Sequence, residues 1–312
     1  MSPSRIPHRV RHALSPLLAI LVVACNAVVV AAPARPRVTR VLLVSVDGLR
    51  PDILLRGDTP VMRALIARGA FTMWARTTAV ATTLPSHTSM LTGMTPPHHG
   101  IVWNSDLPLT HPVYPSRPTL MELAHQVGLT TAMATGKSKF HALARPGTLD
   151  WVYVPADSTM PDAAVADTTV AWIRRGAPQV MFVHLPAVDT AGHAKGWGSR
   201  EQLAAVAEAD RCLGRILAAL AASGKLDSTV VLVSSDHGGA GRGHGPDDPR
   251  SRHIPWIVAG PGIRAGIDLT GDAGLEVNTE DTFATLCMAL GLDPGVGIDG
   301  HAVLQAFEPV DR

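Results

Sequence analysis

Aspartate and histidine side chains recur just after several short apolar runs of this 312-residue chain. A single aspartate in such a place is usually a turn or cap residue, but here three runs end in Asp or in Asp and His. The residues of this set are Asp47, Asp189, His193, Asp236, His237 and His244. Carboxylates and imidazoles gathered in one place repel one another or stay unpaired unless cations neutralise them. The set therefore predicts a metal centre, and its mixed oxygen and nitrogen donors suit Zn²⁺, with Mn²⁺ or another first-row ion as the alternative.

A candidate nucleophile lies in the segment A-T-T-L-P-S-H-T, between Asp47 and a glycine turn at Gly93. Its hydroxyl side chains are those of Thr82, Thr83, Ser86 and Thr88. A hydroxyl bound to a metal at the first turn of a helix would be partly deprotonated, and the helix N-terminus would favour the anion of an attacked phosphate. A threonine at that position also suits an ordinary N-cap. The residue types alone leave the choice among the four hydroxyls open.

Strands and helices must alternate along the chain to position these residues. Short, β-branched apolar runs predict buried strands at residues 41–46, 130–134, 180–184, 229–234 and 256–259. Helical patterns with start and stop signals cover residues 59–69, 199–224 and 279–290. This alternation predicts an α/β sandwich around a mainly parallel sheet, in which ligands bind beyond the carboxyl ends of the strands.

The first 34 residues are expected to lie outside the folded domain. Arginines precede an apolar stretch at residues 13–32, and the small residues Ala32-Pro33-Ala34 follow, as in an export signal. An uncleaved membrane anchor is the second reading, because the stretch approaches the ~20 residues that span a bilayer. A lipoprotein acylated at Cys25 is the third. We therefore expect an exported protein, periplasmic or secreted, with one catalytic domain at residues 35–312 and a possible membrane tether only through its N-terminus.

The composition excludes several classes of protein. An apolar fraction of 46% with 17% charged residues is unlike a disordered or coiled-coil chain. Lys and Arg number 27 against 26 Asp and Glu, and no long run of either sign occurs. A protein that binds a nucleic-acid duplex normally shows a basic excess or stripe. We therefore expect no duplex binding.

Five motifs carry a resemblance to a known family. They are V-D-G-L-R-P-D, T-L-P-S-H-T-S-M-L-T-G, H-H-G-I-V-W-N, D-T-A-G-H and S-D-H-G. In this order they resemble the type I phosphodiesterase/nucleotide pyrophosphatase branch of the alkaline phosphatase superfamily. The resemblance implies an alkaline-phosphatase-like three-layer α/β/α sandwich with a mainly parallel central sheet. It also implies hydrolysis of a small phosphoester or phosphoanhydride through a covalent phosphothreonine.

The same resemblance assigns roles to individual residues. Thr83 matches the family's nucleophile, and Asn104 matches the amide that donates to a phosphoryl oxygen. Two divalent metal ions, with zinc preferred, are implied. The ligands of one ion would be Asp189, His193 and His244. Those of the other would be Asp47, Thr83, Asp236 and His237. His253 competes with His244 for the last position, and His244 is preferred because Gly245 follows it, as in the family's H-G pattern.

Three features depart from the family pattern or extend it. Leu84 replaces an aromatic residue that stacks on a nucleobase, which weakens the expectation of nucleotide specificity. His244 follows His237 by only seven residues, so an insertion that helps to form the substrate pocket is missing. Lys137 and Lys139, in G-K-S-K, resemble lysines of phosphonoacetate hydrolase that meet the anionic group of the substrate, and we expect them to bind substrate here.

Other functions stay open on the same site. A phosphomonoesterase or a phosphonate hydrolase would use the same residues, and a non-catalytic, metal-stabilised anion-binding protein is a further alternative. A sulfatase that uses formylglycine is disfavoured because that chemistry needs C-x-P-x-R. Neither Cys212 nor Cys287 stands in such a motif.

Overall fold

The computed structural model describes Met1 and residues 38–105, 113–157 and 159–309. Residues Arg35–Arg312 form one compact unit. Apart from Met1, the predicted export signal or anchor at residues 1–34 lies outside the described residues. Within the described ranges, no helix combines the length and the apolar character needed to cross a bilayer.

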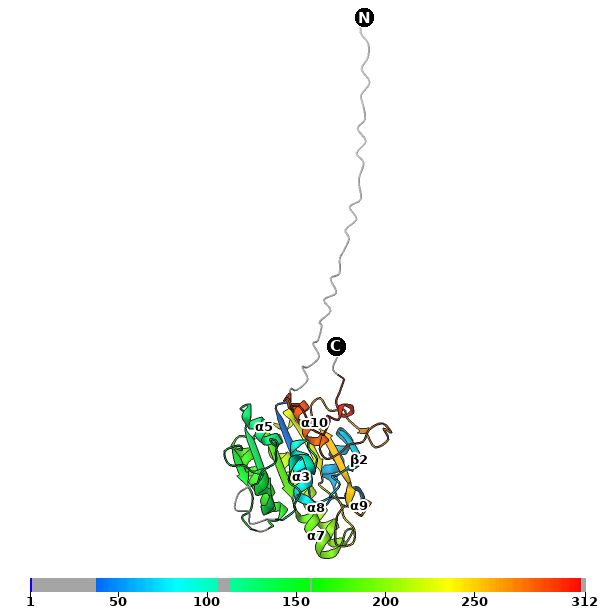
Figure 1. The fold of residues 1–312 in the computed structure, drawn as a ribbon. Coiled ribbons are helices and arrows are strands. Elements are labelled where there is room, and N and C mark those ends of the chain that lie inside the picture. The colour runs from blue at the N-terminus through cyan, green and yellow to red at the C-terminus, as the bar shows by residue number, and fades with distance from the viewer. Residues whose placement is uncertain (2–37, 106–112, 158, 310–312) are drawn as a thin grey trace. The chain divides into compact units, whose positions relative to one another are not determined.

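A β-sheet forms the centre of this unit (Figure 1). It has eight strands in the order β4-β3-β5-β1-β6-β7-β2-β8. Its strands are β1 (Arg40–Val46), β2 (Ala70–Arg76), β3 (Thr131–Thr135), β4 (Trp151–Tyr153), β5 (Val180–Leu185), β6 (Thr229–Ser234), β7 (His253–Ala259) and β8 (Ile267–Asp268). The five strands from β4 to β6 run parallel, and β7 is antiparallel to both β6 and β2. The sheet is therefore mainly parallel, as expected.

Helices cover both faces of the sheet. One face carries α1 (Pro51–Arg56), α2 (Pro60–Arg68), α6 (Asp162–Arg175) and α8 (Arg200–Ala222). The other carries α3 (Thr83–Thr92), α5 (Leu120–Gln126) and α10 (Asp281–Leu290), and Figure 1 shows α3 and α10 side by side over it. Strand β1 feeds both cores because its side chains alternate, with Leu42 on one face and Leu43 on the other. The expected three-layer α/β/α sandwich is confirmed.

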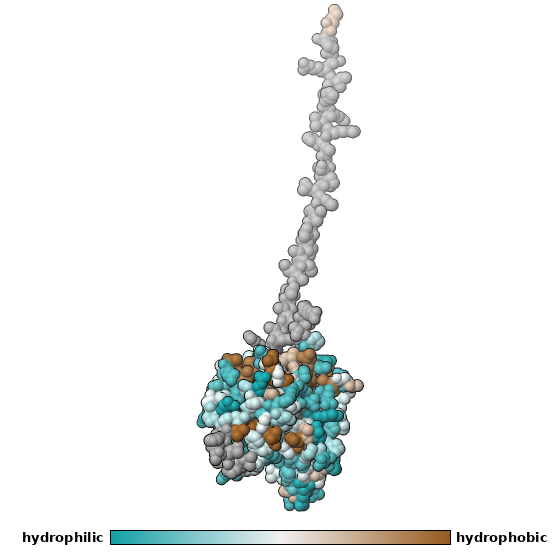
Figure 2. Space-filling model, in the orientation of Figure 1, coloured by the Kyte–Doolittle hydropathy of each residue, from teal (hydrophilic) through white to brown (hydrophobic). Residues whose placement is uncertain are grey.

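Shorter elements connect these layers, namely α4 (Pro96–His99), α7 (Ala187–Lys195), α9 (Pro249–Arg252), η1 (Ser138–Leu143), η2 (Leu226–Ser228) and η3 (Leu304–Ala306). Hydrophilic residues cover much of the face that Figure 2 shows, and apolar residues occur there in separate groups. The large apolar side chains of the two cores lie inside, between the helices and the sheet.

Two expected helix starts differ in detail from the structure. Helix α3 begins at Thr83, and the N-cap is Thr82, whose side chain makes no capping hydrogen bond. Thr83 is thus the first helical residue rather than the cap. The helix expected over residues 199–224 begins at Arg200 as α8, with Ser199 as its N-cap: Ser199 accepts from the Gln202 N–H, and the Gln202 side chain accepts from the N–H of Gly198.

The sheet order explains where a site can form. Strands β5, β1 and β6 are neighbours, and the chain leaves all three at the same edge. In a parallel α/β sheet ligands bind beyond the carboxyl ends of the strands. The loops after these three strands carry the predicted Asp and His residues.

Candidate active site

Three buried aspartates meet at this edge of the sheet. Asp47 directly follows β1, Asp236 follows β6, and Asp189 lies in the first turn of α7, which follows β5. One oxygen of each, Oδ1 of Asp47, Oδ1 of Asp189 and Oδ2 of Asp236, is buried without a hydrogen-bond partner among the described residues. A buried carboxylate oxygen with no partner is strongly unfavourable unless a cation neutralises it. These oxygens therefore fit a site for cations.

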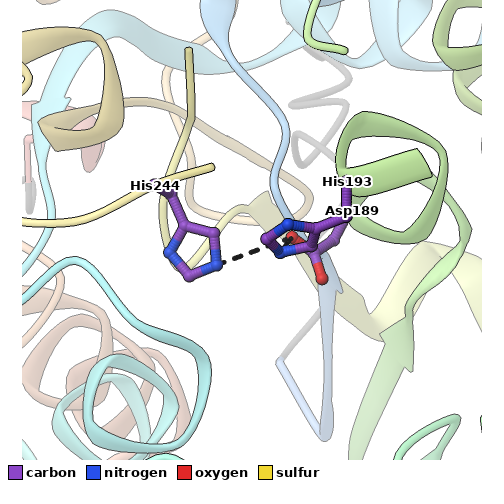
Figure 3. Close-up of side chains that lie close together, drawn as sticks. All are labelled: Asp189, His193 and His244. Atoms are coloured by element: carbon purple, nitrogen blue, oxygen red, sulfur yellow. Dashed lines mark ion pairs between the residues drawn. The ribbon is translucent and has the colours of Figure 1, made fainter. Parts of the chain in front are cut away.

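A first cluster joins Asp189, His193 and His244 (Figure 3). Asp189 Oδ1 lies 3.3 Å from His193 Nε2 and 3.9 Å from His244 Nε2. The Nδ1 atoms of the two rings lie 3.0 and 2.8 Å from the carbonyl oxygens of Arg242 and Ala81. A carbonyl only accepts, so each Nδ1 is the donor, and in a neutral ring the lone pair is left on Nε2. Both rings thus present a ligand nitrogen beside the same carboxylate oxygen, and the hydrogen bond from each Nδ1 to the backbone fixes the orientation of its ring.

A second group of side chains lies beside the first. His237 Nε2 is 3.5 Å from Asp47 Oδ1, 3.2 Å from Asp236 Oδ2 and 3.4 Å from Thr83 Oγ1. Its Nδ1 donates to the Gly238 carbonyl at 2.8 Å, which again leaves the lone pair on Nε2. The side chains of Asp47, Asp236 and Thr83, all expected to bind the second ion, therefore each lie close to His237 Nε2.

The two groups are continuous. The rings of His237 and His244 stack with centroids 3.7 Å apart and planes inclined by 14°. Ligand atoms of Asp47, Asp189 and His237 also lie within 4.8 Å of one another. Asp189 thus faces both groups.

The three carboxyl groups differ in pKa. Burial alone would raise the pKa of Asp47, yet the ammonium of Lys137 holds it well below its usual range. Burial and the charge of Asp47 oppose ionisation of Asp189, but His193 and Lys137 lower its pKa to about 2. Burial, with Asp47, raises the pKa of Asp236 to about 7. Without cations one of the three therefore takes up a proton near neutral pH, and a bound cation would release it.

The two predicted substrate lysines lie at different places in the site. Lys137 places its ammonium against carboxylates, 2.7 Å from Asp47 Oδ2 and 2.6 Å from Asp189 Oδ2. Lys139 donates to Asn104, at 2.9 Å to the backbone carbonyl and 3.3 Å to Oδ1. Binding of the substrate's anionic group by these lysines stays a prediction.

Asn104 lies directly in front of the start of α3. Its Oδ1 accepts from the Leu84 N–H at 2.9 Å, in addition to the contact with Lys139. With the oxygen fixed in this way, the amide NH₂ is directed elsewhere and stays able to donate. The arrangement suits the predicted contact between Asn104 and a phosphoryl oxygen.

Two buried histidines that the motif analysis did not single out support the site. His184 Nε2 lies 2.8 Å from Asp47 Oδ2, and its Nδ1 accepts from the backbone at Gly136. His87 Nδ1 donates to the carbonyl of Thr83 at 2.8 Å. Burial lowers the pKa of both rings to about 4, so both stay neutral. The available signal for His184 was a polar residue inside the otherwise apolar run V-M-F-V-H-L.

His253, the competing ligand, lies at the first position of β7. Its ring stacks on Trp74 with centroids 3.8 Å apart, and it belongs to neither ligand group. The structure brings His244 and not His253 to Asp189 and His193.

The chain is similar in sequence to curated proteins over part of its length. Bis(5'-adenosyl)-triphosphatase enpp4 of Mus musculus is 28% identical over 214 residues, which are 64% of this chain and 47% of that protein. Arylsulfatase K of Danio rerio is 33% identical over 109 residues, 33% of this chain and 20% of that protein. The chain spans less than half the length of these curated relatives.

The solved structure of murine ectonucleotide pyrophosphatase/phosphodiesterase 5 in complex with AMP matches with a TM-score of 0.72 and 15% identity. The match covers 86% of this chain and 100% of that one, and it confirms the expected alkaline-phosphatase-like fold. The family model for type I phosphodiesterase/nucleotide pyrophosphatase matches residues 41–244, a segment that begins before Asp47 and ends at His244. This chain therefore belongs to the type I phosphodiesterase/nucleotide pyrophosphatase family.

Proposed function

We propose that this protein is an exported phosphoester hydrolase of the phosphodiesterase/pyrophosphatase type that holds two Zn²⁺ ions and acts through a covalent phosphothreonine at Thr83. One observation carries the proposal. Three buried carboxylates, each with one oxygen that has no hydrogen-bond partner among the described residues, converge with imidazole nitrogens, and one of these nitrogens, His237 Nε2, lies 3.4 Å from the buried hydroxyl of Thr83. A site of this kind combines cation binding with a nucleophile at a helix N-terminus.

The two ions would be held by separate sets of residues. One set is Asp189, His193 and His244. The other is Asp47, Thr83, Asp236 and His237. When bound, such ions stabilise negative charge on the attacking and leaving oxygens of a phosphoryl transfer.

The residues of the chain then have defined tasks. Thr83 Oγ1 forms a bond to phosphorus while the bond to the leaving oxygen breaks, and the proton of the hydroxyl passes through solvent to the leaving oxygen. Water next cleaves the phosphothreonine, which releases the phosphoryl group and restores the hydroxyl. The Asn104 amide would donate to one oxygen of the transferred group, beside the start of α3, where Asn104 Oδ1 holds the Leu84 N–H.

The substrate class is inferred from the family. A small phosphodiester or pyrophosphate is favoured, since the mouse relative is named for cleavage of a bis-adenosyl triphosphate. Phosphomonoesters and phosphonates are alternatives that the same residues would accept. The arginines and apolar stretch at residues 1–34 support export to the periplasm or the medium, with a membrane-anchored form as the alternative.

Replacement of Thr83 tests the proposal. Thr83→Ala should fold and bind zinc but turn over bis-p-nitrophenyl phosphate at least ~1000-fold more slowly, equivalent to ~4 kcal/mol of barrier. Thr83→Ser keeps the hydroxyl and should retain substantial activity. Acid-quenched wild-type protein should carry phosphate on the peptide that contains Thr83.

Thr82→Ala is the matched control, because Thr82 makes no side-chain capping hydrogen bond. It should have little effect on rate or stability. Near-normal turnover by folded Thr83→Ala would exclude the covalent mechanism. Wild-type protein that binds zinc but hydrolyses no phosphodiester, monoester or phosphonate would favour the anion-binding alternative.

A further inference from the structure

Lys137 occupies a central place in the site. It lies between β3 and η1, and its side chain is only 11% exposed. Its ammonium is 2.7 Å from Asp47 Oδ2 and 2.6 Å from Asp189 Oδ2. These two carboxylates come from different elements, the loop after β1 and helix α7, and belong to different proposed ligand sets. Lys137 is thus a direct link between the two.

The link decides which carboxylate oxygens are left for a metal. Lys137 binds the Oδ2 atom of both aspartates, and His184 also donates to Oδ2 of Asp47. The Oδ1 atoms of both aspartates, which lack a hydrogen-bond partner in the described chain, face ligand nitrogens instead. Asp47 Oδ1 faces His237 and Asp189 Oδ1 faces His193. Each aspartate is therefore oriented to offer one oxygen.

The backbone that carries Lys137 is itself fixed against β5. The N–H of Gly136 donates to His184 Nδ1, and its carbonyl accepts from Met160 N–H at 2.8 Å. A Cβ at Gly136 would lie 2.4 Å from the Pro186 ring, so this close approach requires glycine. The ammonium is thus delivered from a rigid loop, unlike that of a solvated surface lysine, whose rotamer freedom would oppose a fixed position.

We propose that Lys137 is a positioning residue that joins the two metal-ligand sets and holds Asp47 and Asp189 as ligands through one oxygen each. The inference rests on the proposed function in taking these aspartates as metal ligands. It differs from the expected substrate-binding role, because two of the three N–H donors of the ammonium already serve carboxylates.

Measurement of zinc affinity distinguishes a positioning role of Lys137 from a purely electrostatic effect of its charge. Lys137→Met keeps the apolar stem and removes the ammonium. By Coulomb's law alone, loss of a positive charge should strengthen the binding of cations. Positioning predicts the opposite: in competition with a chelating dye, affinity for at least one Zn²⁺ should fall at least ~10-fold. Unchanged or higher affinity would overturn the proposal.

Two further variants sharpen this measurement. Lys225→Met is the control, since Lys225 precedes η2 and the start of β6, at the other end of that strand from the site. It should bind zinc like the wild type. Lys137→Arg keeps the charge but spreads its N–H donors over a planar fork. We expect it to fold and to lose less zinc affinity than Lys137→Met does. Wild-type zinc affinity in Lys137→Arg together with a higher affinity in Lys137→Met would show that charge alone matters and would overturn the geometric role.

Thermal unfolding in the presence of a chelator tests, in the absence of metal, the link that Lys137 makes between Asp47 and Asp189. Lys137→Met should lower Tm by at least about 5 °C, because Asp47 and Asp189 then face each other uncompensated. Addition of Asp189→Asn to this variant should restore part of the loss. A Tm equal to that of the wild type would overturn the link.

Steady-state kinetics distinguish the remaining outcome. A raised KM for bis-p-nitrophenyl phosphate, with zinc affinity and Tm unchanged, would assign Lys137 to substrate binding and overturn positioning. Wild-type protein that takes up no Zn²⁺ would overturn the proposed function together with this role. Wild-type zinc uptake with an unaffected Lys137→Met variant would overturn this role alone.

Discussion

At the scale of single residues, the partner of one ring nitrogen decides what the other nitrogen of a histidine can do. His244 donates from Nδ1 to the Ala81 carbonyl, and burial lowers its pKa to about 4. It therefore presents a neutral Nε2 beside Asp189. His253 has a buried Nδ1 without a partner among the described residues, and its ring lies flat on Trp74.

This contrast gives a paired prediction. His244→Ala should remove at least one of two bound zinc ions and abolish turnover, because it deletes a nitrogen of the first cluster. His253→Ala should leave both ions and a measurable rate. Metal analysis of protein purified without chelator, together with phosphodiesterase assays, measures both. The reverse pattern would transfer the ligand role to His253.

Residue types and position were enough to predict that six Asp and His side chains gather at one edge of the sheet, because each follows a buried strand. Their division into two metal-ligand sets came from the family resemblance and stays a prediction. The contacts of Lys137 could not be predicted in this way. They join residues 90 and 52 positions apart, and a lysine in a glycine loop is normally solvated. Only the packed loop at Gly136 shows that this ammonium is turned inward.

At the scale of elements, the site depends on how closely the loop after β1 approaches α7. Gly48 has a φ of +74°, and a Cβ there would lie 2.9 Å from the Cα of Asp189. A side chain at this position would push apart the elements that carry Asp47 and Asp189.

Gly48→Ala should therefore reduce zinc content as well as stability. Gly128→Ala is a matched control, with a φ of +82° and nothing within 4 Å of the added Cβ. It should cost only the ~1–2 kcal/mol of left-handed backbone strain and leave zinc content unchanged. Thermal unfolding and metal analysis of both variants test this. Equal zinc content in the two would contradict the close-approach argument.

Helix α7 is also tied to α6 through Asp162, whose Oδ1 accepts from the N–H of Ala187, the first residue of α7. Burial raises the pKa of Asp162 from 3.8 to about 7. A folded-state pKa above the unfolded value means that stability is full at low pH and is lost as pH rises through the range 4 to 7.

Asp162→Asn should remove this dependence, because an amide does not ionise. Relative to the wild type, its free energy of unfolding should rise by on the order of a few kcal/mol between pH 5 and pH 8. Urea unfolding in chelator at the two pH values measures this. Asp227→Asn, at an exposed aspartate, is the control. If the difference in free energy of unfolding between the wild type and Asp162→Asn does not change with pH, Asp162 is charged throughout this range.

The elements themselves were predictable to different degrees. Strands β1, β5 and β6 are continuous apolar runs buried on both faces, and their positions follow from sequence. Strand β2, A-F-T-M-W-A-R, mixes polar and large apolar residues and has an exposed Trp74, so it lacks that signal. Its pairing with β7 depends on tertiary contacts far apart in the chain.

At the scale of the whole molecule, the fold places the side chain of Leu84 in the core between the sheet and α3, where it is 1% exposed. A residue buried in this way offers no face to a nucleobase. The position that would carry a stacking aromatic is thus used for packing in this chain.

We therefore expect little preference between nucleotide and simple aryl phosphodiesters. The kcat/KM for a dinucleotide should stay within ~100-fold of that for bis-p-nitrophenyl phosphate, a limit equal to about 2.7 kcal/mol of transition-state stabilisation. Leu84→Phe should not create a nucleotide preference, because the larger ring would overpack the core at a cost of about 1–3 kcal/mol before it reached a substrate. Substrate panels with both proteins, and thermal unfolding of the variant, measure these effects. A nucleotide preference above this limit in the wild type would mean that another residue forms a pocket for the base. A stable Leu84→Phe protein with a new nucleotide preference would show that the side chain at position 84 can turn toward the substrate.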